Sequence, residues 1–371
     1  MHTQTLTLLP SAPGITHQLT VHRFGREGAG PKALIQAALH ADEVPALLVA
    51  QRLRQRLAQL EAEGALRGQV LLVPYANPAG LAQQVLGRHH GRFDLRDGLN
   101  FNRGFADLAP AAAKALAGHL GSNAEANVQL VRDALCGAAA ALPAKTTVQD
   151  MKRRLLQLAA DCSVVLDLHC DAESVLHLYA LTPQADIAQQ LSALLGARAV
   201  LLATESGDGP FDEACTRPWH LLQQRFAGHP LPLGCFAATV ELRGEADTDH
   251  ALAAQDAEAL LAFLQHRGVL AGTPPPLPAP RCVPTPLSAS EPVVAPHAGV
   301  VVFLRAPGDT IAAGEAIADL VDVDSGAVTA VRAQSAGVLY ARVATRWATP
   351  GMPLAKVAGT TLQRTGNLLG A

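Results

Sequence analysis

The chain has 371 residues, of which 49% are hydrophobic and 16% are charged. So apolar a chain can bury a large core, which excludes an intrinsically disordered protein. The net charge of −3 gives no basic field, which argues against a nucleic-acid partner. The length favours two or three domains.

Neither a membrane span nor a secretion signal is visible in the sequence. No apolar run approaches the roughly 18 residues that a bilayer-spanning helix needs. The first residues, 1–14, lack a basic stretch followed by an apolar core. Six scattered cysteines without a Cys-x-x-Cys pair indicate reduced thiols rather than disulfides or a cysteine-type zinc site. We therefore expect a cytoplasmic protein.

The first half of the chain alternates between strand and helix signals. Residues 33–40 form a short apolar run closed by polar residues and predict a buried strand. Residues 44–60 carry leucines at helical spacing and predict a helix that ends near Gly64. Residues 69–80 predict a second strand that runs into a loop of Pro, Asn and Gly. The alanine-rich residues 110–145 have a helical composition, and we interpret them as an inserted element.

Two more strands and a helix follow. Residues 163–169 and 234–242 predict the strands, and a helix across 249–266 follows residues suited to capping. Strands that alternate with helices predict an α/β fold, with a mostly parallel or mixed sheet and helices on both faces. Ligands of such sheets bind at the carboxyl ends of the strands. The motifs described below all lie at such ends.

A change of composition marks the main boundary of the chain. Residues 273–292 are rich in proline and predict an extended, semi-rigid linker between a domain of residues 1–272 and a smaller one of residues 293–371. The smaller domain is rich in Val, Gly and Ala and contains a weak internal repeat, 296–320 against 333–359. Two similar halves of short strands predict a small β-sandwich or flattened barrel with pseudo-twofold symmetry.

The small domain resembles the biotinyl/lipoyl carrier fold, in which a lysine stands at the hairpin tip between the two halves. The corresponding stretch here, residues 321–330, contains no lysine. The only lysine of the domain is Lys356, which lies inside a predicted strand. We therefore expect a structural or assembly role for this domain rather than that of a swinging arm.

Two histidines and a glutamate follow predicted strands at positions that suit one metal ion. His40 and Glu43 stand three residues apart where the chain turns from strand into helix, so both could reach the same ion. His169 ends the strand 163–169, and Asp167 on the same strand face could orient a ligand. Each motif taken singly also fits an ordinary polar strand end. Together, two imidazoles and a carboxylate leave a fourth position open, which is typical of a catalytic zinc site.

Glu241, at the end of the apolar strand 234–242, is the candidate general base. A zinc-bound water needs a group to take its proton and a leaving amine needs one to supply it, and a single glutamate can do both in turn. A surface glutamate paired with Arg243 is the ordinary alternative. Glu245 and Glu205 are weaker rivals for the role.

The loop 91–105 is dense in Arg, Asp and Gly, and three phenylalanines within it indicate that it is packed. Arginine presents a planar fork of donors that fits a carboxylate, and Asn102 beside Arg103 adds a neutral amide. Loops of this composition are often merely solvated. Beside a metal, however, this one would bind a substrate carboxylate.

The order His-x-x-Glu, Asn-Arg, His and Glu resembles that of the succinylglutamate desuccinylase/aspartoacylase family, within the zinc carboxypeptidase clan. The resemblance covers roughly residues 30–270, and an appended small β domain also occurs in that family. It implies a zinc-carboxypeptidase-like α/β domain that binds one Zn²⁺ per chain. His40, Glu43 and His169 match the zinc ligands, although the family more often has Gly where Ala41 stands.

The resemblance also implies roles for the remaining candidates. Glu241 in VELRG matches the general base and acid, and Asn102 and Arg103 in NFNRGF match the pair that holds a substrate carboxylate. An upstream arginine of the family helps to polarise the scissile carbonyl. Arg92 is the candidate here, and its spacing to Asn102 leaves Arg96 open as well.

The expected reaction is zinc-dependent hydrolysis that removes an acyl group from an N-acyl amino acid. The alternative is a carboxypeptidase-like metallo-exopeptidase that acts on peptides or on a poly(amino acid) such as cyanophycin. A deacylase needs a closed pocket and an exopeptidase an open cleft, and the acidic residues 205–213 fit either a pocket for a cationic side chain or an exposed loop. A non-catalytic scaffold, which need not hold zinc, is the third possibility. The expected partner is a small carboxylate-bearing amide or peptide, and a homo-oligomer is compatible with the sequence.

Overall fold

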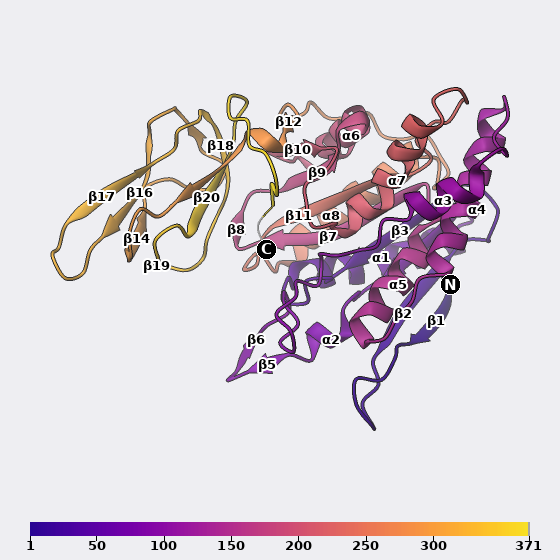
Figure 1. The fold of residues 1–371 in the computed structure, drawn as a ribbon, viewed down its shortest axis with the longest axis horizontal. Coiled ribbons are helices and arrows are strands. Elements are labelled where there is room, and N and C mark those ends of the chain that lie inside the picture. The colour runs from indigo at the N-terminus through magenta and orange to yellow at the C-terminus, as the bar shows by residue number, and fades with distance from the viewer. Residues whose placement is uncertain (370–371) are drawn as a thin grey trace.

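The protein consists of a large mixed sheet flanked by helices and, beside it, two small antiparallel sheets built by the C-terminal part of the chain (Figure 1). The computed structural model describes residues 1–369. The predicted α/β class with a small all-β addition is therefore confirmed. In Figure 1 the last residues, drawn in yellow, return from the small sheets toward the large one.

The large sheet has nine strands, and its central strands supply the site. In spatial order they are β1 (His2–Thr7), β2 (Gln18–Phe24), β4 (Gln69–Val73), β3 (Lys32–Ala37), β7 (Val164–Asp171), β11 (Phe236–Gly244), β9 (His177–Leu181), β10 (Ala199–Ala203) and β12 (Thr285–Pro286). Strands β4, β3, β7 and β11 run parallel to one another. On one side of them β2 pairs antiparallel with β4, and β1 pairs antiparallel with β2. On the other side β9 pairs antiparallel with β11. The carboxyl ends of β3, β7 and β11 consequently meet at one edge.

Helices cover both faces of this sheet, as the alternating sequence predicts. One face packs against α1 (Pro45–Ala62), α6 (Ala185–Leu195) and α8 (His250–His266). The other packs against α3 (Ala109–Leu116), α4 (Ala124–Ala140), α5 (Thr147–Ala159) and α7 (Phe211–Arg225). Strand β7 is buried on both sides, because Leu166 belongs to the first core and Val165 to the second. Burial on both faces explains the continuous apolar run with which this strand begins, residues 164–166.

The predicted helices and strands agree closely with the observed ones. The strand expected over 163–169 is β7, and the helix expected over 249–266 is α8, which Asp249 caps through bonds from two backbone N–H groups. The alanine-rich segment 110–145 contains α3 and α4. Sequence patterns missed the antiparallel pair β1–β2 and the strand β9, because short strands with mixed polarity carry little periodic signal.

The C-terminal part forms two sheets that enclose a small core of their own. One holds β13 (Ser290–Val294), β20 (Pro353–Ala358), β18 (Gly337–Arg342) and β15 (Thr310–Ile311), and the other holds β17 (Val328–Arg332), β16 (Ala316–Val321), β14 (Gly299–Phe303) and β19 (Trp347–Ala348). The two halves of the internal repeat each supply three strands, β14–β15–β16 and β18–β19–β20. The lysine-free stretch 321–330 spans the turn between β16 and β17.

The proline-rich stretch is only partly a linker. Residues 273–284 contain no helix or strand, whereas Thr285–Pro286 pairs with β10 as an edge strand and β13 begins at Ser290. The large domain in turn contributes a strand to the small one, since its β8 (Glu173–Ser174) pairs with β18. We propose that the two parts are separate domains joined at this seam.

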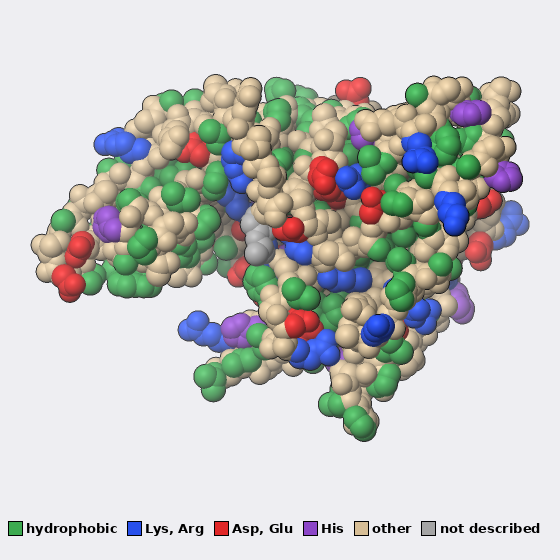
Figure 2. Space-filling model, in the orientation of Figure 1, with side chains coloured by type: hydrophobic (Ala, Val, Ile, Leu, Met, Phe, Trp, Pro, Cys, Tyr) green, Lys and Arg blue, Asp and Glu red, His purple; other side chains and the backbone are tan. Residues whose placement is uncertain are grey.

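The face of the molecule drawn in Figure 2 has no dominant charge. On the face drawn in Figure 2, basic and acidic side chains are interspersed among polar and apolar ones. A small hairpin of β5 (Gln84–Val85) and β6 (Arg88–His89) projects beside the short helix α2 (Pro78–Leu81) (Figure 1). Within residues 1–369, no helix combines the length and apolar character that crossing a bilayer requires.

Candidate active site

The connection between β3 and α1 presents the first two candidate ligands. Ala38 adopts a left-handed conformation with φ of 56°, and the chain then crosses the sheet edge before α1 begins at Pro45. Gly91 packs so closely beneath this loop that a Cβ there would lie 2.1 Å from the backbone nitrogen of Asp42. Its carbonyl accepts a hydrogen bond from Ala41 N at 3.0 Å. The contacts with Gly91 thus hold the loop that carries His40 and Glu43 in place.

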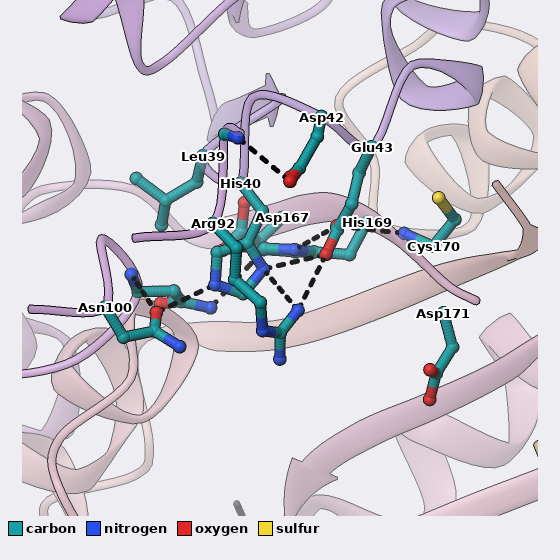
Figure 3. A network of polar contacts seen from close by, with 12 residues as sticks. Leu39, His40, Asp42, Glu43, Arg92, Asn100, Asp167, His169, Cys170 and Asp171 are labelled. Carbon is teal, nitrogen blue, oxygen red and sulfur yellow. Dashed lines mark hydrogen bonds and ion pairs between the residues drawn. The ribbon is translucent and has the colours of Figure 1, made fainter. Parts of the chain in front are cut away.

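The three predicted ligands converge at this edge (Figure 3). His40 Nδ1 lies 2.8 Å from Glu43 Oε1, and His169 Nδ1 lies 2.7 Å from Glu43 Oε2. Each of these buried residues offers one ligand atom, and the three atoms lie within 4.8 Å of one another. Because both histidines turn the same nitrogen toward the carboxylate, their lone pairs can share one ion. The donor set of two imidazoles and a carboxylate fits Zn²⁺.

Both outer ring nitrogens are held by other side chains. His40 Nε2 lies 2.8 Å from Asn100 Oδ1, and His169 Nε2 lies 2.9 Å from Asp167 Oδ2. Asp167 is held in turn by Gln36, whose Nε2 donates to its other oxygen at 2.9 Å. Oxygen acceptors at Nε2 fix the tautomer in which Nδ1 is free to bind a metal. Sequence patterns pointed to Asp167 but not to Asn100, which lies 60 residues from the histidine it holds.

Charge and burial set the proton affinities of this cluster. Burial would raise the pKa of Glu43, but the charges of His169 and His40 outweigh burial and lower it. Burial would likewise lower the pKa of His169, but Asp167 and Glu43 raise it well above the usual value. Burial dominates for His40 and lowers its pKa. A cluster in which one carboxylate binds two imidazoles therefore favours a positive charge at its centre, as a divalent ion would supply.

Glu241 lies on the strand next to His169, with which it is paired in register across β11 and β7. Burial, reinforced by the charge of Glu43, raises the pKa of Glu241 to about 8. Its Oε2 is buried without a hydrogen-bond partner among the described residues. The ordinary alternative, pairing with Arg243, does not occur, since Arg243 bonds to Asp256.

The rivals of Glu241 lie elsewhere. Glu205 is exposed and pairs with Arg217 at 3.1 Å. Glu245 does not line the pocket described below, and its backbone nitrogen bonds to the carbonyl of Asp171. Glu241 is therefore the one of the three that faces the pocket.

Arg92 and Arg96 are placed very differently. Arg92 Nη1 lies 3.2 Å from both His40 Nδ1 and Glu43 Oε1, at the rim of the ligand cluster (Figure 3). Arg96 instead donates a hydrogen bond from Nη2 to Asp94 Oδ2 at 2.7 Å. It does not line the cavity described below. Of the two candidates, Arg92 is therefore the one that lies beside the ligand cluster.

Asn102 and Arg103 lie beside the histidines and line the same pocket. Asn102 Oδ1 accepts a hydrogen bond from the backbone N–H of Phe211 at 2.9 Å, and its Nδ2 lies 3.4 Å from His169 Nε2. Arg103 donates to the Asn102 carbonyl at 2.7 Å. Burial, together with the charge of Arg92, lowers the pKa of the Arg103 guanidinium. Two neighbouring arginines make this end of the pocket attractive to an anion.

A cavity of about 390 Å³ opens in front of these residues. Its size lies within the range of small-molecule sites. From the acidic segment 205–213, Ser206, Asp212 and Glu213 reach the cavity. Burial raises the pKa of Asp212 to about 7, with a further contribution from Glu213. The segment is therefore partly a pocket wall and not simply an exposed loop.

The small β domain contributes to the same cavity, which sequence patterns did not reveal. Lys356 on β20 lines the cavity and binds Asp171 at 2.6 Å, two residues beyond His169. The tail after β20 also returns to this site, where Leu368 N donates to the Ser206 carbonyl at 2.8 Å. The predicted strand position of Lys356 is confirmed, and the residue stands far from any hairpin tip.

Solved structures with the same overall architecture exist. A succinylglutamate desuccinylase/aspartoacylase family protein of Shewanella amazonensis is 29% identical, with a TM-score of 0.83 over 96% of this chain and 98% of that one. A related protein of Shewanella frigidimarina is 27% identical, with a TM-score of 0.86 over 96% and 97% of the two chains. An ectoine utilization protein of Ruegeria pomeroyi shares the fold at 19% identity, with a TM-score of 0.67 over 96% and 95%.

The family profile agrees with these likenesses. No curated protein matches the chain at a significant level. The profile of the succinylglutamate desuccinylase/aspartoacylase catalytic domain matches residues 29–267, which is more than half of the chain and contains every candidate ligand. The chain therefore belongs to the succinylglutamate desuccinylase/aspartoacylase family.

Proposed function

We propose that this protein is a zinc-dependent amidohydrolase that removes the acyl group from an N-acyl amino acid. The observation that carries the proposal is the buried cluster of His40, Glu43 and His169, whose ligand atoms lie within 4.8 Å of one another. Both histidines line the same pocket as Glu241. Membership of a family of desuccinylases and aspartoacylases supports hydrolysis as the reaction class.

His40 and His169 would hold one Zn²⁺ per chain through Nδ1, and Glu43 would hold it through a carboxylate oxygen. When bound, zinc would polarise the substrate carbonyl and lower the pKa of a water molecule beside it. Asn100 and Asp167 would keep both imidazoles in the ligating tautomer.

Glu241 would take the proton of the attacking water and later deliver it to the leaving nitrogen. Its buried, unpartnered Oε2 and its raised pKa suit it to hold a proton between the two steps. Arg92, at the rim of the cluster, would face the negative charge that develops on the carbonyl oxygen.

Asn102 and Arg103 would bind the carboxylate of the amino acid and so orient the amide. A guanidinium fits a carboxylate with two parallel hydrogen bonds, and such anchoring converts binding energy into alignment of the reacting atoms. Residues of the C-terminal tail and of the small domain line part of the pocket and so narrow it, which supports a deacylase over an exopeptidase with an open cleft.

A scaffold without catalysis would have no need of this arrangement. The proposed ligands, the side chains that contact their Nε2 atoms and the proposed general base lie around one pocket, which supports an enzyme. All six cysteines are free, which supports the proposal of a reducing, cytoplasmic location.

Metal analysis and a hydrolysis screen test the proposal together. The purified full-length protein should contain about one zinc per chain, and it should hydrolyse members of a panel of acetyl-, succinyl- and formyl-amino acids. Exhaustive chelation should abolish this activity, and added zinc should restore it. Equal activity after demetallation would contradict metal dependence, whereas cleavage confined to short peptides or cyanophycin would favour the exopeptidase.

A further inference from the structure

The face of the large sheet that carries His169 and Glu241 becomes less polar from β7 toward β10. Asp167 and His169 on β7 and Thr239 and Glu241 on β11 lie on the same face, because the two strands pair in register. Across the antiparallel pairing of β11 with β9, Tyr179 stands opposite Thr239. Leu201 on β10 is the register partner of Tyr179. The face is thus polar on β7 and β11. On β9 it carries the buried His177 opposite Glu241, followed by Tyr179 and Leu181, of which only the latter two line the cavity, and on β10 it is apolar.

Apolar side chains continue this surface around the cavity. The apolar wall, as we define it, comprises cavity-lining residues of β9, β10, the turn before β13 and the C-terminal tail: Tyr179, Leu181, Leu201, Ala203, Leu287, Leu368 and Leu369. Adjacent strands lie about 4.8 Å apart, so β10 lies roughly 14 Å from β7. The wall therefore begins beyond Glu241 and extends away from the ligand cluster.

The charged groups near the wall are already engaged within the protein. Lys356 is balanced by Asp171 at 2.6 Å. Arg364 donates to the carbonyls of Ser290 at 3.1 Å and Leu368 at 2.9 Å, which holds the tail in place. Lys356 thus joins the small domain to the catalytic domain, and Arg364 joins the tail to β13.

Other polar groups that line the cavity, Glu213 and Tyr340 among them, also have partners within the protein. Glu213 accepts hydrogen bonds from the backbone and hydroxyl of Ser206, at 2.9 and 2.6 Å. The Tyr340 hydroxyl lies 2.8 Å from Ser290 Oγ and also bonds to Tyr179. A second substrate carboxylate would have to lose its hydration here without a dedicated partner, which is costly.

From this arrangement we propose that the substrate carries an uncharged, apolar substituent of several carbons, which packs on the apolar wall. The inference rests on the proposed function, since the amide is placed by the metal cluster and by Arg103. The substituent could belong to the acyl group or to the amino-acid side chain. In both cases the chemistry recognised is the same, and a dicarboxylic substrate is disfavoured.

Two matched pairs of compounds test the proposal on the zinc-loaded, full-length protein. The acyl arm compares N-pentanoylalanine with N-succinylalanine, and the side-chain arm compares N-acetylleucine with N-acetylaspartate. Within each pair the shape is similar and the charge differs. We expect kcat/KM to favour the apolar member by at least about tenfold in one arm, because a single methylene in an apolar pocket is worth about 10- to 200-fold. The arm that shows the preference identifies the source of the substituent.

Binding supplies a second readout that does not need turnover. Calorimetric titration of the zinc-loaded Glu241→Gln variant with the same compounds should show the same preference in Kd. Hydrolysis with the dicarboxylate equal or better in both arms would overturn this inference while leaving the proposed function intact. Tighter binding of the apolar member without any hydrolysis would support this inference and contradict the proposed function. Absence of binding by both members of both pairs would overturn the inference.

A variant of the wall separates specificity from folding. Leu368 is half-buried in the tail, so Leu368→Arg should leave the core intact and reduce the apolar preference at least tenfold. Leu277→Arg, at an exposed position of the proline-rich stretch away from the cavity, is the matched control and should keep the parental preference. An unchanged preference in Leu368→Arg would overturn the role of the tail in the wall.

Discussion

Glu241 differs from an ordinary glutamate in its surroundings more than in its sequence context. It ends an apolar strand, and only the pairing of β11 with β7 brings it beside His169. Its carboxylate is buried near Glu43, and both effects raise its pKa to about 8. A group of this kind can exchange a proton near neutral pH, which general acid–base catalysis requires.

Replacing Glu241 by Gln should therefore abolish proton transfer while keeping the shape of the side chain. We expect kcat to fall by at least about two orders of magnitude, because positioned acid–base groups contribute about 10²- to 10⁴-fold. Zinc content should stay at the parental level, since Glu241 is outside the proposed ligand set. Steady-state kinetics and metal analysis check both expectations, and parental turnover in this variant would refute the assignment.

Asn100 is the residue of the site that sequence reasoning overlooked. Its Oδ1 holds His40 Nε2 at 2.8 Å and also accepts from the backbone N–H of Asn102 at 2.8 Å. Nothing in the segment around Asn100 distinguishes it from any loop asparagine, because the contact it makes is with a residue 60 positions away.

Asn100→Ala should weaken zinc binding by about 10- to 100-fold, the usual cost of removing a partner that orients a ligating histidine. Competition with a chelator of known affinity measures the change. Gln129→Ala, at an exposed position on α4, serves as the matched control and should bind zinc as the parent does. Equal affinity in both variants would show that Asn100 does not orient the ligand.

At the scale of elements, the connection between β3 and α1 depends on a close backbone contact. Gly91 lies against the backbone of Ala41 and Asp42, and a Cβ on it would meet three backbone atoms at 2.1 to 2.8 Å. The contact brings the Arg92 segment against the ligand loop. Glycine at this position is therefore a packing requirement, since its φ lies outside the left-handed region.

Gly91→Ala should lower the free energy of unfolding by about 1–3 kcal/mol, the usual cost of overpacking, and should weaken zinc binding because the ligand loop must shift. Gly137→Ala is the matched control, because a Cβ there meets nothing within 4 Å and the residue lies inside α4. This control should gain roughly 0.5–1 kcal/mol from the better helix former. Denaturant unfolding of both variants decides, and equal stabilities would contradict the packing argument.

At the scale of the whole molecule, ion pairs fasten the small domain to the catalytic one. Glu173 beside β7 accepts from Arg342 Nε and from Arg346 Nη2, each at 2.6 Å. Burial would raise the pKa of Glu173, but the hydrogen bonds from the two arginines outweigh it and lower the pKa. The carboxylate is therefore more acidic in the folded protein than in the unfolded chain.

The sign of this shift predicts a pH dependence. A lowered folded-state pKa stabilises the protein above the unfolded value of about 4.3, and the stabilisation is lost as the pH falls through the lower folded value. Glu173→Gln should consequently lower Tm at neutral pH, and the difference from the parent should shrink in acid. Thermal unfolding across this pH range measures it, and high salt should reduce the effect.

The control for this pair is Glu27→Gln, at an exposed loop position with no ion pair among the described residues. Its Tm should follow that of the parent at every pH. A difference between Glu173→Gln and the parent that persists in acid would show that the glutamate acts through packing and not through its charge.

The sequence by itself determined the α/β class, the positions of the central strands and the three residues that meet in the buried His-Glu-His cluster. Because β7 is buried on both faces, it begins with an apolar run, and the polar residues that follow this run lie toward the carboxyl edge of the sheet. The symmetric strand pattern of the small domain followed from its internal repeat for the same local reason.

Tertiary structure alone decided which distant groups complete the pocket. The approach of Arg92 to His40, the support of His40 by Asn100 and the arrival of Lys356 and the tail at the cavity all depend on contacts across dozens or hundreds of residues. The periodicity of a sequence indicates only the local structure of a segment and which of its faces is buried. Contacts between segments depend on how the layers pack, and a single sequence carries no direct signal for them.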